Sequence, residues 1–275
     1  MLAASFVLAG AAAAQAPQRI VSMNLCADEL LLRLAPERVV SVTWLSQDPA
    51  VSTLAAAARR RVANHGQAEE VVALAPDLVV AGRYTTATAT AFLRRLGVEV
   101  ALVDPPATLA AARATITRLA DRIGASERGA ALVAQLDRGV AAVAADGAPP
   151  RAIVLDPNGF TVGAGSLVAE LMARAGLANV APELGIENYG RLPLEAIVTA
   201  GIEVLIVDAE AGEVPALATE LLAHPALRRL GRRIVTASVP SRLWTCAGPQ
   251  LGEAVRILAD AAHAARVARR GEAGR

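Results

Sequence analysis

Lysine is absent from this 275-residue sequence, and all 27 basic residues are arginine. Without lysine the chain cannot form a Schiff base with a carbonyl substrate, and it lacks the lysine of a phosphate-binding loop. The arginines are balanced by 26 acidic residues, which leaves a formal net charge of only +1. A chain so close to neutral has no basic excess of the kind that binds nucleic acid or acidic lipid, and we expect neither partner.

Histidine is also scarce, with only His65, His224 and His263 in the whole chain. A metal ion held by protein side chains needs several ligands that converge from both sides of a site. His224 lies in a helix-ending His-Pro pair and His263 in a predicted terminal helix, so neither is expected at a cleft. His65 is the one candidate for ligand contact, and the sequence predicts no resident metal site.

The motifs of common enzyme classes are missing as well. Gly163-Ala164-Gly165 begins like a dinucleotide fingerprint, but Val168 stands where the third glycine is needed. Asp28 and Glu29 are adjacent on a predicted helix and face different directions, so they do not form an acid–base pair. The sequence therefore predicts a protein that is not an enzyme.

The N-terminus is apolar and rich in small residues, like the core and cleavage region of a secretory signal. It is too short to span a bilayer. Ala14-Gln15-Ala16 has the form of a cleavage site, although Pro17 favours cutting after Ala13 or Ala14. Ala11 follows Leu8-Ala9-Gly10 where a lipoprotein would carry cysteine. We expect residues 1–16 to be a signal peptide and the mature protein to be soluble in the periplasm without a lipid anchor; the alternative is an apolar cytosolic N-terminus.

One segment occurs twice in the chain. EEVVALAPDLVV starts at Glu69, and EAIVTAGIEVLI starts at Glu195. Each copy reads as a short amphipathic helical turn opened by a glutamate, then a break, an acid and an apolar strand. The repeat predicts two similar lobes, each with one exposed carboxylate, and two lobes imply a cleft for a ligand.

Strands and helices alternate on both sides of a long helical segment, which predicts an α/β fold with mostly parallel sheets. The predicted parts are a first lobe at residues 17–125, a connecting helix at 126–146 and a second lobe at 147–275. In open α/β sheets the ligand lies beyond the carboxyl ends of the strands, so the strand exits are candidate ligand loops.

Aromatic residues make up only 3% of the chain, and those near predicted strand ends are candidate walls for a macrocycle or a catecholate chelate. These candidates are Trp44, Tyr84, Tyr189 and Trp244. Arginines that could clamp an anionic ligand lie beside them. They are Arg83, Arg191 and Arg242. The alternatives are that the aromatic rings plug loops and that the arginines are solvated loop charges.

The only cysteines are Cys26, after the first strand, and Cys246, after the last. Two cysteines in an oxidising compartment are usually paired. Because both are expected to face the cleft, three arrangements remain open: a disulfide, two unpaired thiols, or direct contact with a ligand or metal.

Several runs in this order resemble the substrate-binding proteins of ABC importers, in the class with two Rossmann-like lobes joined by one long helix. These runs are RIVS at 19–22, ALAPDLVV at 73–80, GSLVAEL at 165–171, AGLANV at 175–180, Leu194-Glu195 and the segment from Trp244 to Pro249.

The resemblance implies that a glutamate on each lobe docks on the permease, and Glu69 and Glu195 match that pattern. It also implies a monomer that works with an ABC permease dimer and its ATPase subunits. The cargo it implies is a small-molecule metal chelate, and we expect a ferric siderophore, with cobalamin or haem as alternatives. A sensor or scaffold of the same fold, or an enzyme, is the remote alternative from another class.

Overall fold

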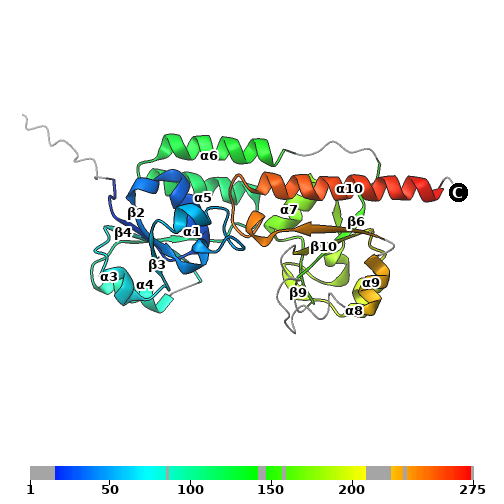
Figure 1. Ribbon diagram of the computed structural model, residues 1–275, viewed down its shortest axis with the longest axis horizontal. Helices are drawn as coiled ribbons and strands as arrows, with labels where there is room; N and C mark the ends of the chain where they lie inside the picture. Colours follow the sequence, from blue (N-terminus) through cyan, green and yellow to red (C-terminus); the bar gives the residue numbers. More distant parts are fainter. Residues whose placement is uncertain are drawn as a thin grey trace, which may run out of the picture.

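The protein forms two α/β lobes that lie side by side in the computed structural model (Figure 1). The structure describes residues 16–84, 87–141, 147–156, 159–208, 224–231 and 234–273. The expected signal peptide falls outside these residues except for its last position. No helix in the described ranges is long and apolar enough to cross a membrane.

The first lobe is built on a five-stranded sheet in which every pair of neighbours is parallel, in the order β3-β2-β1-β4-β5. Its strands are β1 (Ile20–Ser22), β2 (Val39–Thr43), β3 (Val62–Asn64), β4 (Leu78–Gly82) and β5 (Val100–Val103). Its helices and 3-10 turns are α1 (Leu25–Leu34), η1 (Pro36–Arg38), η2 (Trp44–Gln47), α2 (Ala55–Ala58), α3 (Ala68–Val72) and α4 (Ala87–Arg95).

The second lobe repeats this plan with four parallel strands in the order β11-β10-β6-β8, beside an antiparallel pair of β7 and β9. Its strands are β6 (Arg151–Leu155), β7 (Phe160–Val162), β8 (Ala178–Asn179), β9 (Tyr189–Arg191), β10 (Val204–Asp208) and β11 (Val235–Val239). Its helices and 3-10 turns are α7 (Leu167–Arg174), η4 (Ala181–Leu184), α8 (Leu194–Thr199), α9 (Pro225–Gly231), η6 (Ser241–Leu243) and α10 (Leu251–Ala273).

The repeated segment occupies the same place in each lobe. Glu69 lies in the first turn of α3 and Glu195 in the first turn of α8. Six residues after each glutamate the chain turns through a positive φ, at Ala75 (46°) and Gly201 (62°). An alanine in this region costs about 1 kcal/mol, so the turn at Ala75 is imposed by the surrounding fold.

The acid before each repeated strand also plays the same structural part. Asp77 accepts hydrogen bonds from the backbone N–H groups of Gln18 and Arg19, at the start of β1. Glu203 accepts one from the backbone N–H of Arg151, at the start of β6. Each acid therefore joins its own strand to an inner strand of its sheet. These matching contacts confirm that the sequence repeat marks two structurally equivalent lobes.

The lobes are joined by helices that contact both of them. Helix α5 (Leu109–Arg122) begins beside the second lobe, where the Leu109 N–H donates to Glu170 at 2.7 Å. It ends beside the first, where Arg38 donates to the Ile123 carbonyl at 2.6 Å. Helix α6 (Ser126–Gly139) then packs along α5. It ends at Gly139, earlier than the predicted residue 146, and residues 142–146 lie outside the described chain.

One apolar core runs through the molecule from lobe to lobe. The same cluster of buried side chains contains Leu31 of α1, Ile116 of α5, Leu136 of α6, Leu171 of α7 and Leu258 of α10. At the join of α6 and α10, a Cβ on Gly252 would lie 2.7 Å from the Gly139 Cα, so the approach of the two helices requires glycine at position 252. A shared core resists separation of the lobes, which favours small motions over wide opening.

Candidate functional site

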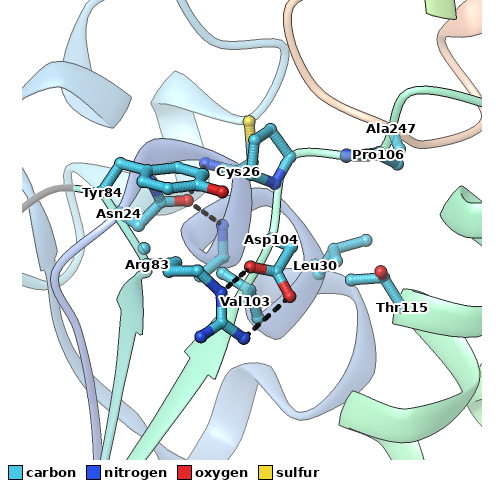
Figure 2. A pocket seen from close by; sticks show the side chains of 13 residues that line it. Asn24, Cys26, Leu30, Arg83, Tyr84, Val103, Asp104, Pro106, Thr115 and Ala247 are labelled. Atoms are coloured by element: carbon cyan, nitrogen blue, oxygen red, sulfur yellow. Dashed lines mark hydrogen bonds and ion pairs between the residues drawn. The ribbon is translucent and has the colours of Figure 1, made fainter.

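A cavity of about 210 Å³ lies at the carboxyl edge of the first sheet, at its junction with the second lobe. Tyr84 follows β4, Pro105 and Pro106 follow β5, and Cys26 opens α1 after β1. Ala247 reaches the cavity from the other lobe. Figure 2 shows Tyr84 and Asn24 near Cys26, with Pro106 and Ala247 together on the other side. Most of the lining is apolar, as a macrocycle or other flat ligand requires.

The cavity contains one positive and one negative side chain, and they are bonded to each other (Figure 2). The Arg83 guanidinium makes two contacts with the Asp104 carboxylate, one of them at 3.1 Å. The hydrogen bond to Asp104 raises the pKa of Arg83, and the hydrogen bond from Arg83 lowers the pKa of Asp104. The pair carries no net charge, so Arg83 is not the free cation that the sequence suggests.

A disulfide joins Cys26 to Cys246 and so connects the two lobes at the edge of this cavity. Of the three arrangements that the sequence leaves open for the cysteines, the structure contains the disulfide. Cys26 lies in the first turn of α1, where the Asn24 side chain caps the helix by accepting from the N–H groups of Cys26 and Ala27. Cys246 lies in the segment between η6 and α10. The bridge thus adds a covalent restraint to the shared core.

Trp44 and His65 form a second group on the same sheet edge, after β2 and β3. Their rings are stacked, with centroids 6.2 Å apart and planes at 25°. Glu70 accepts a hydrogen bond from the His65 backbone N–H at 2.7 Å and lies 3.0 Å from His65 Nδ1. The backbone bond from His65 is the main cause that lowers the pKa of Glu70. Trp44 is 51% exposed, so a face of this stack is open to solvent.

The candidates of the second lobe lie on different elements. Tyr189, on β9, is 71% exposed. Arg191, on the same strand, lies with its guanidinium carbon 4.4 Å from the centre of the Phe160 ring. Arg242 is half-buried in η6. Phe160, at the start of β7, is an exposed aromatic that the sequence analysis did not single out.

Trp244 does not lie where the sequence predicts. It is only 8% exposed and belongs to the main apolar core. The 3-10 turn η6 after β11 directs this side chain inward, and a strand-exit position alone does not reveal such a turn. The expectation of an exposed aromatic ring is therefore wrong for Trp244.

Three further residues of the cavity were missed from the sequence: Asp104, Pro105 and Pro106. They follow β5 directly, so the rule that selected Tyr84 after β4 would have selected them too. In the sequence this run signals only the end of a strand, so it was not selected as part of the site.

Two buried carboxylates lie in the first lobe beneath this edge, and they serve separate networks. Asp28 accepts from the backbone N–H and the hydroxyl of Thr43, at 3.0 and 2.5 Å. Burial raises the pKa of Asp28 to about 7. Glu29 instead accepts from Ser52, Thr53 and Arg33. The two side chains point apart, as the sequence predicts.

Glu69 and Glu195 are both exposed. Their helices α3 and α8 lie on the same side of the molecule in Figure 1, opposite α6 and α10. Among the described residues, neither carboxylate forms a hydrogen bond or an ion pair. The two glutamates therefore present a pair of free negative charges on one surface.

Comparison with known proteins identifies related chains. A cobalamin-binding protein of Halobacterium salinarum (strain R1) is 28% identical over 238 residues, which cover 81% of this chain and 62% of the relative. The chain thus spans about three fifths of the length of the curated relatives it matches.

Solved structures share the fold. The periplasmic heme-binding protein RhuT from Roseiflexus sp. RS-1 has a TM-score of 0.68 and 24% identity, with 89% of this chain and 99% of that chain covered. The vitamin B12-binding protein BtuF of Vibrio cholerae has a TM-score of 0.64 and 19% identity, with 91% and 98% covered. The model of the periplasmic binding protein family matches residues 20–231, most of the chain. The chain belongs to the periplasmic binding protein family.

Proposed function

We propose that this protein is the substrate-binding component of an ABC importer and that it carries a corrinoid to a membrane permease. The observation that supports this cargo best is the apolar cavity between the lobes, whose two charged side chains neutralise each other. A relative that matches most of the chain is a cobalamin-binding protein, which points the same way.

The charge of the cavity distinguishes the possible cargoes. An anionic ligand that loses its water shell needs an unpaired cation in the site. Arg83 is bonded to Asp104, and Arg191 lies over Phe160. The charge of the one arginine that lines the cavity is therefore already offset, and Arg191 and Arg242 are not among the lining residues. A corrin ring fringed by neutral amides needs apolar surface and neutral hydrogen-bond partners, and this cavity offers both.

A cavity of this size holds one edge of such a ring. The rest of the ligand would extend along the sheet edge towards Trp44 and towards Tyr189 on the other lobe, both of which are exposed. Arg242 is the remaining candidate contact from the second lobe. Haem is the second candidate cargo, since Tyr84 and Tyr189 carry exposed phenols that can ligate iron. A ferric siderophore is the third.

Permease docking is assigned to Glu69 and Glu195. Two exposed carboxylates on rigid helices can pair with arginines of the permease dimer, and such pairs steer encounter and fix orientation more than they add affinity. The complex would contain the permease and its ATPase subunits, with this protein as a monomer. The same proposal includes export of the protein, with cleavage near residue 16. It also includes two lobes at 17–125 and 147–275, a connector at 126–146 and the absence of catalysis.

The cargo is tested by isothermal titration of the purified protein with cyanocobalamin. We expect saturable binding that Tyr84→Ala weakens about tenfold or more, because the variant removes a large aromatic contact from the cavity. Phe92→Ala is the matched control, since Phe92 is an exposed aromatic that does not line this cavity. Equal affinity in the wild type and Tyr84→Ala would place the ligand elsewhere.

A further inference from the structure

We propose that a groove between α3 and α4, beside Glu69, receives an apolar side chain of the partner on which the protein docks. This inference rests on the proposed function and deepens it, because it gives the chemistry of the permease segment that fits: a basic side chain next to an apolar one. The evidence comes from the surface around Glu69 and from the repeated segment that contains it.

The groove has a volume of about 590 Å³ and lies between the start of α3 and the first turns of α4. These two helices pack against each other (Figure 1). Most of the lining consists of small side chains, and Phe92, which is 45% exposed, forms an apolar wall. The small lining residues include Gly66, Ala68, Ala87 and Ala89. All the described lining residues belong to the first lobe, and none of them lines the cavity between the lobes.

The groove carries a single negative charge. Glu69 is the only charged residue in its described lining, and the carboxylate forms no hydrogen bond or ion pair with another described residue. A cation of the partner can bind this carboxylate while the neighbouring apolar side chain enters between the small residues and covers Phe92. An exposed ion pair contributes little affinity by itself, whereas a buried aromatic contact is a common source of binding energy. The groove therefore supplies the affinity that the carboxylate alone lacks.

Apolar surface accompanies the free carboxylate in both lobes. Val72 follows Glu69 by three residues in α3, and it is 40% exposed. Val198 follows Glu195 by the same interval in α8, and it is 38% exposed. A spacing of three places each valine on the same face of its helix as the glutamate. The residue before each valine is fully buried, so the helix is anchored to its lobe without the valine.

The match between the lobes indicates a shared partner. Single exposed apolar residues are normal on a protein surface and need no explanation. Here they occur at the same place in two lobes, next to the same free charge. Helices α3 and α8 also lie on the same side of the molecule (Figure 1). Two equivalent patches on one side fit a partner with two equivalent sites, such as a dimer with twofold symmetry.

The groove can be altered without disturbing the core of the lobe. Val71 of α3 and Leu93 of α4 are fully buried in one apolar cluster, and they hold the two helices on the sheet. Phe92 and Thr88 are exposed on the outer side of α4. Phe92→Ala therefore removes the apolar wall, and Thr88→Trp fills the groove with a ring. The two changes alter the groove volume in opposite directions.

The test measures docking on the ABC permease with its ATPase subunits, purified from the source organism and placed in lipid nanodiscs. Surface plasmon resonance without added cargo gives the association and dissociation rates independently of which cargo is carried. We expect Phe92→Ala and Thr88→Trp each to dissociate about tenfold faster than the wild type. Glu69→Ala should instead slow association and reduce its dependence on salt.

Leu96→Ala is the matched control, because Leu96 is an exposed apolar residue directly after α4 that does not line the groove. It should dissociate at the wild-type rate. Melting temperatures and cyanocobalamin affinities equal to those of the wild type verify that each variant is folded.

Three results would overturn the inference. Wild-type dissociation of Phe92→Ala and Thr88→Trp, together with impaired docking of Glu69→Ala/Glu195→Ala, would remove the groove from the interface and leave the proposed importer intact. Failure of the wild-type protein to bind the permease would overturn the proposed function and the inference together. A concentration-dependent dimer in sedimentation that Phe92→Ala dissociates would assign the groove to a second copy of this chain.

Discussion

Removal of the disulfide between the lobes should cause a large loss of stability. The bridge joins residues 220 apart in sequence. A cross-link over so long a loop restricts the unfolded chain strongly, and the loop-entropy relation gives about 5 kcal/mol at 25 °C. We therefore expect the variant Cys26→Ala/Cys246→Ala to unfold more easily by about this amount. Alanine is preferred to serine because Cys246 is buried, and a serine hydroxyl there would add a penalty of its own.

The expected change in melting temperature follows from the size of the chain. Unfolding entropy is about 2.1 cal/mol/K per residue, or about 0.6 kcal/mol/K for a protein of this length. A loss of about 5 kcal/mol then lowers Tm by about 9 °C. Circular dichroism during a thermal ramp measures the shift, and urea titration measures the free energy of unfolding.

Reductant provides the control for this experiment. It should lower the Tm of the wild type towards that of the double variant and leave the double variant unchanged. A double variant that melts within about 2 °C of the wild type would refute the reasoning. Such a result would mean that the unfolded chain is already restricted without the bridge.

Two further predictions concern charged side chains. Glu69→Ala/Glu195→Ala should abolish transport in cells and leave the affinity for cobalamin unchanged in titration; a loss of affinity would place these residues in the ligand site. Burial raises the pKa of Asp28 to about 7, so the folded protein retains a proton that the unfolded chain releases above its usual pKa of 3.8. Stability is therefore lost as pH rises from about 4 to 7, by up to about 4 kcal/mol, and Asp28→Asn should remove this dependence. Urea unfolding at pH 5 and pH 8 measures it, and an equal difference between variant and wild type at both values would contradict the account.

The fold was largely predictable because the sequence repeats its own pattern. The two copies of the repeat gave the two lobes, and strand–helix alternation gave the parallel sheets. The end of α6 was less predictable, because the helical periodicity of the sequence continues past Gly139, the last residue of the helix. The local sequence pattern therefore predicted which helices and strands form better than it predicted where they end.

The candidate site was predictable in position and less so in chemistry. Strand exits located Tyr84 and Trp44 at the sheet edge, but nothing local to Arg83 shows that Asp104, 21 residues later, would neutralise it. The cysteine pairing stayed open for the same reason, since it depends on how the lobes meet. Trp244 was expected to line the cleft because the inward turn of η6 has no clear signature in the sequence. For Arg83 and for the cysteines, a contact distant in sequence decided the chemistry.

The central claim, capture of a corrinoid at the junction of the lobes, is tested most directly by a competition measurement. Tryptophan fluorescence of the purified protein is followed while cyanocobalamin, hemin, a ferric hydroxamate and a ferric catecholate are titrated alone and against one another. The account predicts saturable, sub-micromolar quenching by cyanocobalamin that the anionic ferric catecholate does not reverse. Saturable quenching by a ferric siderophore alone, with no response to cyanocobalamin, would contradict it.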